Sequence, residues 1–151
     1  FYTTMPCLLP EEYSRFGVKV VSRVAGRIPA LKSDLMLFDS ATGELLSLVE
    51  CDWITAMRTG AVATLAIKTF RSAVASIYAF VGLGSTARAT LTCLLDSSPS
   101  EELNIRLFRY KDQAEKIVAE YGHYANARFE IVDTMEELVA GADVVVSCIF
   151  L

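Results

Sequence analysis

A glycine-rich turn between an apolar run and a helical segment most constrains the fold of this chain. The turn follows residues 76–81, reads Gly82-Leu83-Gly84-Ser85-Thr86-Ala87 and fits the pattern G-x-G-x-x-A. In this pattern the first glycine makes a tight turn, the second lets the backbone approach a pyrophosphate, and a small third residue lets helix and strand pack closely. The free amides that open the following helix then face the phosphates. We therefore expect dinucleotide contacts from Gly82, Gly84, Ser85, Thr86 and Ala87.

Residues 72–151 repeat the alternation of apolar runs and helical segments that surrounds this turn. Strands are expected at 76–81, 104–110, 128–132 and 143–149, and helices at 85–95, 111–121 and 135–140. The expected strands are continuous apolar runs, as in a parallel sheet covered on both faces. Because right-handed crossovers join parallel strands in this order, we predict an α/β fold with a Rossmann-type, doubly wound parallel sheet over residues 72–151.

The first 71 residues have a different pattern. Residues 17–24 alternate as a half-buried strand does, and strands at 34–39 and 44–49 flank a turn-forming segment. A helix is expected over 53–70, with Asp52 as its cap. We therefore predict that residues 1–71 form part of a smaller α/β domain with an antiparallel sheet. The chain begins like the middle of a strand and without Met, so we expect the start of the protein to be missing.

Charge and hydropathy argue against two classes of partner. The net charge is −4, whereas nucleic-acid binding requires clustered lysines and arginines. The longest uncharged run, Ser72–Ala87, is interrupted by glycines and falls short of the ~20 apolar residues of a spanning helix. We therefore expect neither a nucleic-acid nor a membrane partner. The apolar content and the short antiparallel strands of residues 1–50, which cannot close a core alone, instead predict a homodimer.

The cysteines are scattered, form no C-x-x-C pair and are accompanied by a single histidine, His123. This pattern predicts neither a metal site nor a disulfide framework, and it is typical of a cytoplasmic protein with reduced cysteines. We interpret His123, which follows a helical segment, as a surface residue. Cys148 lacks a basic neighbour that would activate its thiol.

Two further residues lie at expected carboxyl ends of strands, where open α/β sheets bind their ligands. Ser147 ends the last strand, where backbone contact with the cofactor and plain strand packing are both open interpretations. Arg109 ends the second strand, and no carboxylate follows before Asp112. An acidic residue at this position accepts hydrogen bonds from the ribose of NAD, whereas a basic residue pairs with the 2′-phosphate of NADP. Arg109 therefore favours NADP(H), with NAD(H) or a merely solvated strand end as the alternatives.

The expected helix over 53–70 carries the most specific motif, Ile54-Thr55-Ala56-Met57-Arg58-Thr59-Gly60-Ala61. It resembles the L-T-A-x-R-T-[AG]-A motif of the ornithine cyclodeaminase/mu-crystallin family. Three other segments resemble family motifs in the same order: Met5-Pro6, the strand that contains Lys19, and the D-x-x-T-G hairpin over 39–44. The glycine-rich turn resembles the family's G-x-G-x-Q-A-R, with Thr86 in place of glutamine. The resemblance covers essentially the whole chain.

The resemblance implies roles for three residues. Lys19 and Arg58 would hold the carboxylate of the substrate, and Thr59 would contact the phosphates of the cofactor. The chemistry agrees, because arginine offers a two-pronged clamp for a carboxylate and lysine a compact charge. For Lys19, the alternation within an apolar strand leaves an outward, solvated side chain as a second interpretation.

The activity that the resemblance implies is hydride transfer between nicotinamide and the α-carbon of a small amino or imino acid. Thr3 occupies the place where ornithine cyclodeaminases of the family have a glutamate, which favours a ketimine reductase or amino-acid dehydrogenase. The alternatives are an ornithine cyclodeaminase, which eliminates ammonia and forms proline, and a non-enzymatic NADP-binding protein like some crystallins. The family's catalytic aspartate is expected beyond residue 151.

Overall fold

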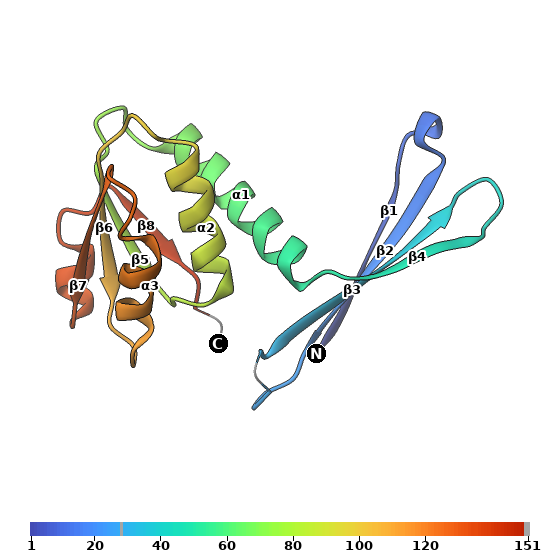
Figure 1. Cartoon of the computed structure of the whole chain (residues 1–151), viewed down its shortest axis with the longest axis horizontal. Helices are drawn as coiled ribbons and strands as arrows, with labels where there is room; N and C mark the ends of the chain where they lie inside the picture. Colours follow the sequence, from blue (N-terminus) through green and yellow to red (C-terminus); the bar gives the residue numbers. More distant parts are fainter. Residues whose placement is uncertain (28, 150–151) are drawn as a thin grey trace. The chain divides into compact units, whose positions relative to one another are not determined.

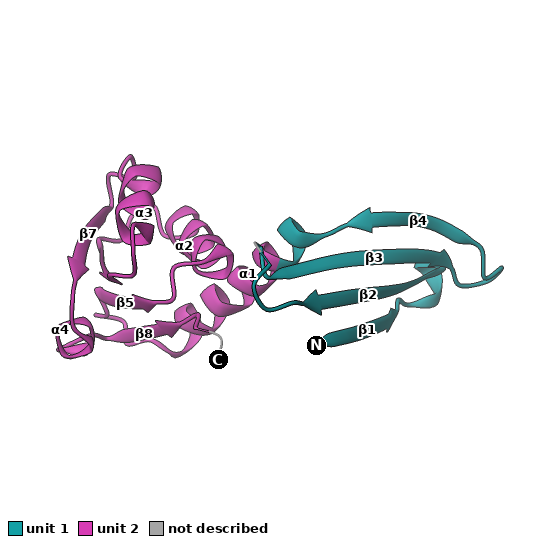
Figure 2. Cartoon of the chain, turned by 90° about the horizontal axis from the view of Figure 1, so that it is seen from below, with its two compact units in different colours: residues 1–55 teal, residues 56–151 magenta. Residues whose placement is uncertain are grey.

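The computed structural model describes residues 1–27 and 29–149, and the chain divides into two compact units, 1–55 and 56–151. Figure 2 colours the two units separately. The boundary falls inside helix α1 (Asp52–Phe70), so most of this helix groups with the second unit. The sequence-based boundary, between residues 71 and 72, follows the end of the same helix. The functional division between these parts stays a prediction.

The first unit contains a four-stranded antiparallel sheet with the strand order β1-β2-β3-β4 (Figure 1). The strands are β1 (Tyr2–Leu8), β2 (Arg15–Arg23), β3 (Leu31–Asp39) and β4 (Leu45–Glu50), and the short 3-10 helix η1 (Glu11–Tyr13) joins the first two. Strand β3 begins three residues earlier than the sequence pattern predicts. The reason is its partner, because β2 and β3 stay in register from the Arg15–Asp39 pair to the Arg23–Leu31 pair.

The hairpin between β3 and β4 shows why the D-x-x-T-G segment has these residues. The carboxylate of Asp39 accepts hydrogen bonds from the backbone N–H groups of Ala41, at 2.8 Å, and Thr42, at 3.1 Å. These bonds hold the pKa of Asp39 below its usual value. Gly43 has a φ of +78°, in the region that glycine occupies without strain. The motif is therefore accounted for locally as a turn.

The second unit contains a parallel sheet with the strand order β7-β6-β5-β8. Its strands are β5 (Ile77–Val81), β6 (Leu103–Phe108), β7 (Ala127–Val132) and β8 (Val144–Ser147). The connecting helices are α2 (Ser85–Asp96), α3 (Gln113–Tyr121) and α4 (Met135–Val139). This is the predicted α/β alternation, with boundaries that differ from the expected ones by two residues at most. The core side chains that are fully buried include Tyr78, Phe80, Leu91, Ile105, Leu107 and Ile117.

Helix α1 packs against α2 through a glycine. A Cβ atom on Gly60 would lie 2.5 Å from the carbonyl carbon of Ala89 and 2.6 Å from the nitrogen of Thr90, closer than real Cβ contacts. One turn further on, the hydroxyl of Thr64 donates to the carbonyl oxygen of Thr90 at 3.3 Å. The glycine of the R-T-G-A motif therefore permits a backbone approach between two helices.

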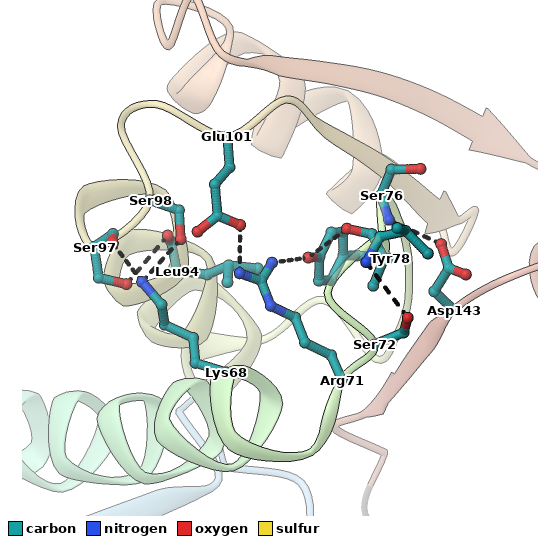
Figure 3. A network of polar contacts seen from close by, with 12 residues as sticks. Lys68, Arg71, Ser72, Ser76, Tyr78, Leu94, Ser97, Ser98, Glu101 and Asp143 are labelled. Carbon is teal, nitrogen blue, oxygen red and sulfur yellow. Dashed lines mark hydrogen bonds and ion pairs between the residues drawn. The ribbon is translucent and has the colours of Figure 1, made fainter.

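A polar network closes the amino edge of the parallel sheet (Figure 3). The ammonium of Lys68 donates to the carbonyl oxygen of Ser97 at 2.5 Å, which ties the end of α1 to the end of α2. Arg71 donates to the hydroxyl of Tyr78 and forms an ion pair with Glu101. At the start of β8, the carboxylate of Asp143 accepts the N–H groups of Ser76 and Ile77 at 2.8 and 2.9 Å, which lowers its pKa. These contacts fix the edge opposite the glycine-rich turn.

Within residues 1–27 and 29–149, no helix combines the length and the apolar character needed to cross a membrane. The same part of the chain contains no cluster of three or more histidine, cysteine, aspartate or glutamate side chains arranged to hold a metal ion.

Candidate functional site

The glycine-rich turn lies at the point where the strand order reverses. The chain passes from β5 to β6 to β7 on one side of the sheet and then returns to β8 on the other side of β5. In open α/β sheets this reversal leaves a crevice at the carboxyl ends of the two strands, where ligands bind. The carboxyl ends here are Val81 and Ser147, which are partners in the register of β5 and β8.

Gly82 makes room for the chain that leaves β8. Its φ is +81°, and a Cβ atom would lie 2.7 Å from both the carbonyl carbon of Cys148 and the nitrogen of Ile149. The N–H of Cys148 donates to the carbonyl oxygen of Val81 at 2.8 Å, which holds the two segments together. Any side chain at this position would therefore meet backbone atoms and a strained φ.

Gly84 has the opposite surroundings. It is the N-cap of α2, is exposed, and has an extended backbone with φ −81° and ψ −164°. A Cβ atom on Gly84 would have no neighbour within 4 Å among the described residues, so its missing side chain leaves open space outside the helix. The first intrahelical bond runs from the N–H of Arg88 to the carbonyl oxygen of Gly84.

The start of α2 can bind an anion. The N–H groups of Ser85, Thr86 and Ala87 precede the first intrahelical bond, and helix geometry leaves such amides without an internal partner. Together with the helix dipole they favour a phosphate group. Ala87 is completely buried in the core beside β5, where a larger side chain would separate helix from strand. Open space over Gly84 and available amides beneath it fit the pyrophosphate of a dinucleotide.

Ser147 and Cys148 lie beside this turn. Ser147 is the last residue of β8 and is exposed, whereas Cys148 is half-buried and packs against the main core. Burial raises the pKa of the Cys148 thiol, so it stays protonated at neutral pH. A role as a reactive cysteine is therefore disfavoured, as the sequence indicated.

Arg109 directly follows β6 at the same edge of the sheet, and its N–H donates to the carbonyl oxygen of Val132 at 2.9 Å. Its guanidinium is paired with two carboxylates: Nε contacts Asp133 at 2.5 Å, and Nη1 contacts Glu115. The hydrogen bond and charge of Asp133, followed by the charge of Glu115, raise the pKa of Arg109 further. Sequence reasoning missed these partners, although Asp133 follows the expected strand 128–132 directly.

Lys19 points to the start of α1 in the first unit. Its ammonium donates to the hydroxyl of Thr55 at 3.4 Å, and this hydroxyl is hydrogen-bonded to that of Ser33 at 2.9 Å. The backbone N–H of Ser33 donates to the carboxylate of Asp52 at 2.6 Å. Burial opposes ionisation of Asp52, but the hydrogen bonds of Lys32 and Ser33 outweigh it and lower the pKa. Lys19 is therefore half-buried in a polar network rather than freely solvated.

The other two residues of the expected site lie on α1 in the second unit. Arg58 is exposed, and Thr59 is half-buried directly before the buried Gly60. Of the residues of the expected cofactor site, Thr59 lies on α1, and the structure brings the others to one edge of the parallel sheet: Gly82, Gly84, Ser85, Thr86, Ala87, Arg109 and Ser147. Lys19 belongs to the other unit.

Two hollows of the described surface lie away from this edge. One, of about 410 Å³, is lined by residues that include Leu95, Asp96 and Tyr124. Here the Tyr124 hydroxyl donates to Asp96 at 2.5 Å, and this bond together with burial raises the pKa of Tyr124 to about 12. The other, of about 380 Å³, lies against Phe16 and Phe38 in the first unit. Neither hollow is lined by a residue of the expected site.

Comparison with known proteins identifies the family. The family model of the ornithine cyclodeaminase/mu-crystallin family matches residues 2–150. The chain belongs to this family. Among its relatives is ketimine reductase mu-crystallin of Mus musculus, which is 26% identical over 121 residues, or 80% of this chain and 37% of the relative. The chain therefore spans little more than a third of the length of that relative.

Solved structures with the same fold include a dehydrogenase and a reductase. An archaeal alanine dehydrogenase dimer with bound NAD superposes with a TM-score of 0.81 at 23% identity, covering 95% of this chain and 44% of that one. The Δ1-pyrroline-2-carboxylate reductase of Thermococcus litoralis, in complex with NADH and L-proline, gives 0.77 at 22% identity, covering 97% and 51%. At these identities the likeness shows the fold alone, and it confirms the predicted Rossmann-type sheet with part of a second domain.

The two glycines of this family's turn are expected to respond differently to the same substitution. Gly82→Ala places a Cβ against the backbone of residues 148–149 at a positive φ, so we expect a loss of about 1–3 kcal/mol in the free energy of unfolding. Gly84→Ala adds its methyl group to open space, so it should lower the free energy of unfolding less than Gly82→Ala does, by no more than the replacement of a favourable N-cap residue costs. Denaturant unfolding of both variants tests this, and equal stability would contradict the assigned geometry.

Proposed function

We propose that this chain forms the cofactor-binding part, and part of the substrate-binding part, of an NADP(H)-dependent oxidoreductase that acts on a small amino or imino acid. One observation carries the proposal: the Gly82–Ala87 turn lies at the strand-order reversal, with open space at Gly84 and available amides on α2. When bound, the nicotinamide supplies hydride exchange with the α-carbon of the substrate. The protein's part is to bind and orient the two molecules.

The proposed anchors of the substrate are Lys19 and Arg58. Two cations complement the carboxylate that every amino or imino acid carries, and an arginine can bind both of its oxygens at once. Support for Lys19 comes from its half-buried position and its bond to Thr55, which hold the ammonium in place. Arg58 is exposed, three residues beyond Thr55 in the same helix, and its side chain is accessible to a ligand. Thr59 is proposed to contact the cofactor phosphates.

Arg58→Ala should raise the Michaelis constant for the amino or imino acid steeply, because it removes a charge-assisted bond of about 1.5–3 kcal/mol. Folding should be unaffected, since the side chain is exposed. Arg128→Ala serves as the matched control, because Arg128 is an exposed arginine that pairs with Glu102 at the amino edge of the parallel sheet. Steady-state kinetics of both variants test the role. Equal Michaelis constants for Arg58→Ala and the wild type would assign Arg58 to the surface.

A ketimine reductase or amino-acid dehydrogenase is favoured over the family's cyclodeaminase activity. Thr3, at the place of the cyclodeaminases' glutamate, is the residue that supports this preference. An ornithine cyclodeaminase would release ammonia from ornithine, and a crystallin-like protein would bind NADP without turnover. Cofactor oxidation with a panel of cyclic imines, followed alongside ammonia release from ornithine, separates the three activities.

NADP(H) is the proposed cofactor, because the residue at the end of β6 is Arg109 and not a carboxylate. Arg109→Asp replaces an attraction for the 2′-phosphate by a repulsion, so the ratio of the dissociation constants of NADPH and NADH should reverse. Arg128→Asp introduces the same charge change away from the site and should leave the ratio unchanged. Tighter binding of NADH than of NADPH by the wild type would refute the preference.

A homodimer in the cytoplasm completes the proposal. Strands β1 and β4 expose large apolar side chains, among them Tyr2, Leu8, Leu45 and Leu48. A homodimer formed through the strands of residues 1–50 would cover such surface. The unpaired state of Cys7, Cys51, Cys93 and Cys148 suits a reducing compartment. Sedimentation of the protein at micromolar concentration is expected to show a dimer, and a monomer would contradict this part of the proposal.

A further inference from the structure

The two carboxylates that bind Arg109 come from different elements of the second unit. Asp133 follows β7, and Glu115 lies in the first turn of α3. The side chains of Arg109, Asp133 and Glu115 are 43%, 68% and 46% exposed, so all three are accessible to a ligand. They form one cluster at the carboxyl edge of the sheet, at the end of the second Rossmann strand, where the ribose of a dinucleotide is recognised.

The geometry of the guanidinium makes this pairing consequential. A phosphate or carboxylate binds arginine most strongly when it spans two neighbouring nitrogens of the planar group. Those edges are formed by Nε with Nη2 and by Nη1 with Nη2. Asp133 engages Nε and Glu115 engages Nη1, so each edge already has one nitrogen bonded to a carboxylate. A phosphate that binds both nitrogens of either edge would compete with a carboxylate for a nitrogen to which that carboxylate is already bonded.

The two carboxylates also offset the attraction that the neighbouring cations exert on a phosphate. Arg109 contributes one positive charge and its partners two negative charges, so the cluster is negative overall. Lys111 adds a second cation nearby, with its ammonium 5.3 Å from the centre of the Tyr110 ring. Asp112 is paired with Lys116 at 2.7 Å, and these two charges offset each other. A 2′-phosphate would therefore meet two cations and two carboxylates, whereas a 2′-hydroxyl is neutral.

We propose that Asp133 and Glu115 are specificity-determining residues that compete with the 2′-phosphate of NADP for Arg109 and thereby limit the preference for NADP over NAD. The inference rests on the proposed dinucleotide site and on the assignment of Arg109 within it. Removal of either carboxylate should strengthen the binding of NADP and leave the binding of NAD almost unchanged. Exposed ion pairs of this kind are weak, so each carboxylate should reduce the selectivity for NADP over NAD without preventing NADP from binding.

The test compares Asp133→Asn, Glu115→Gln and the double variant with the wild type. We expect each single variant to bind NADPH about twofold to fivefold more tightly, the range that corresponds to breaking an exposed ion pair. The dissociation constant of NADH should change by less than about twofold in the same variants. Adenosine 2′,5′-bisphosphate and 5′-AMP, which differ only in the 2′-phosphate, provide a second pair of probes that report on this phosphate without the nicotinamide.

Glu130→Gln is the matched control, because Glu130 is also an acid on β7 that pairs with an arginine of β6, Arg106, at 2.9 Å. It should leave both dissociation constants unchanged. Unchanged NADPH binding in Asp133→Asn would overturn the inference. Weaker NADPH binding would overturn it as well, and would make Asp133 a residue that orients Arg109. Equal tightening of NADPH and NADH would overturn it too, as a general charge effect. Failure of the wild type to bind either dinucleotide would instead refute the proposed function, together with the inference that rests on it.

Discussion

Backbone passes against backbone at two glycines of the second unit, and the arrangement of the carboxyl edge of the parallel sheet depends on both approaches. At Gly60, helix α1 meets the backbone of α2, and at Gly82 the end of β5 meets the chain that leaves β8. A methyl group at either place would fall within 2.7 Å of main-chain atoms, which cannot move aside as a flexible side chain can. The first approach positions α1 on α2, the helix whose amides are proposed to hold the pyrophosphate. The second approach lets the ends of β5 and β8 lie side by side.

The amino and carboxyl edges of the parallel sheet differ in whether their hydrogen-bonding groups have partners within the protein. At the amino edge, Asp143 and the pair of Arg71 with Tyr78 satisfy their hydrogen-bonding groups within the protein. At the carboxyl edge, Gly84 leaves open space and the first amides of α2 have no acceptor within the helix. Groups that are satisfied internally hold the strands together, whereas groups left available can bind a ligand. Arg109 lies between these cases, because its partners are internal but exposed.

The periodicity of the sequence predicts much of this fold. The features that it does not predict depend on which strands are neighbours in the sheets. The β-α alternation of residues 72–151 is visible in the sequence, although the strands are not all the continuous buried runs that it predicts: β5 is buried along most of its length, whereas β6, β7 and β8 alternate more and less buried positions. The sequence does not delimit strand β1, because Tyr2–Leu8 contains Pro6 and mixes polar with apolar residues. Such sequences suit an edge strand, whose hydrogen bonds come from one neighbour. The partners of Arg109 depend on β7 being the neighbour of β6, a fact of topology that no local pattern contains.

Two residues of the short motif on helix α1 have structural contacts on either side of the proposed ligand-binding residues. Thr55 belongs to the polar network of the first unit, where it is bonded to Lys19 and Ser33, and Gly60 belongs to the contact with α2 in the second. Arg58 and Thr59 lie between these two positions in the sequence. Thr55 is held by its hydrogen bonds to other side chains, and Gly60 is held by its contact with the backbone of α2. Arg58 and Thr59 therefore lie on a helix whose residues to either side are held by contacts of their own.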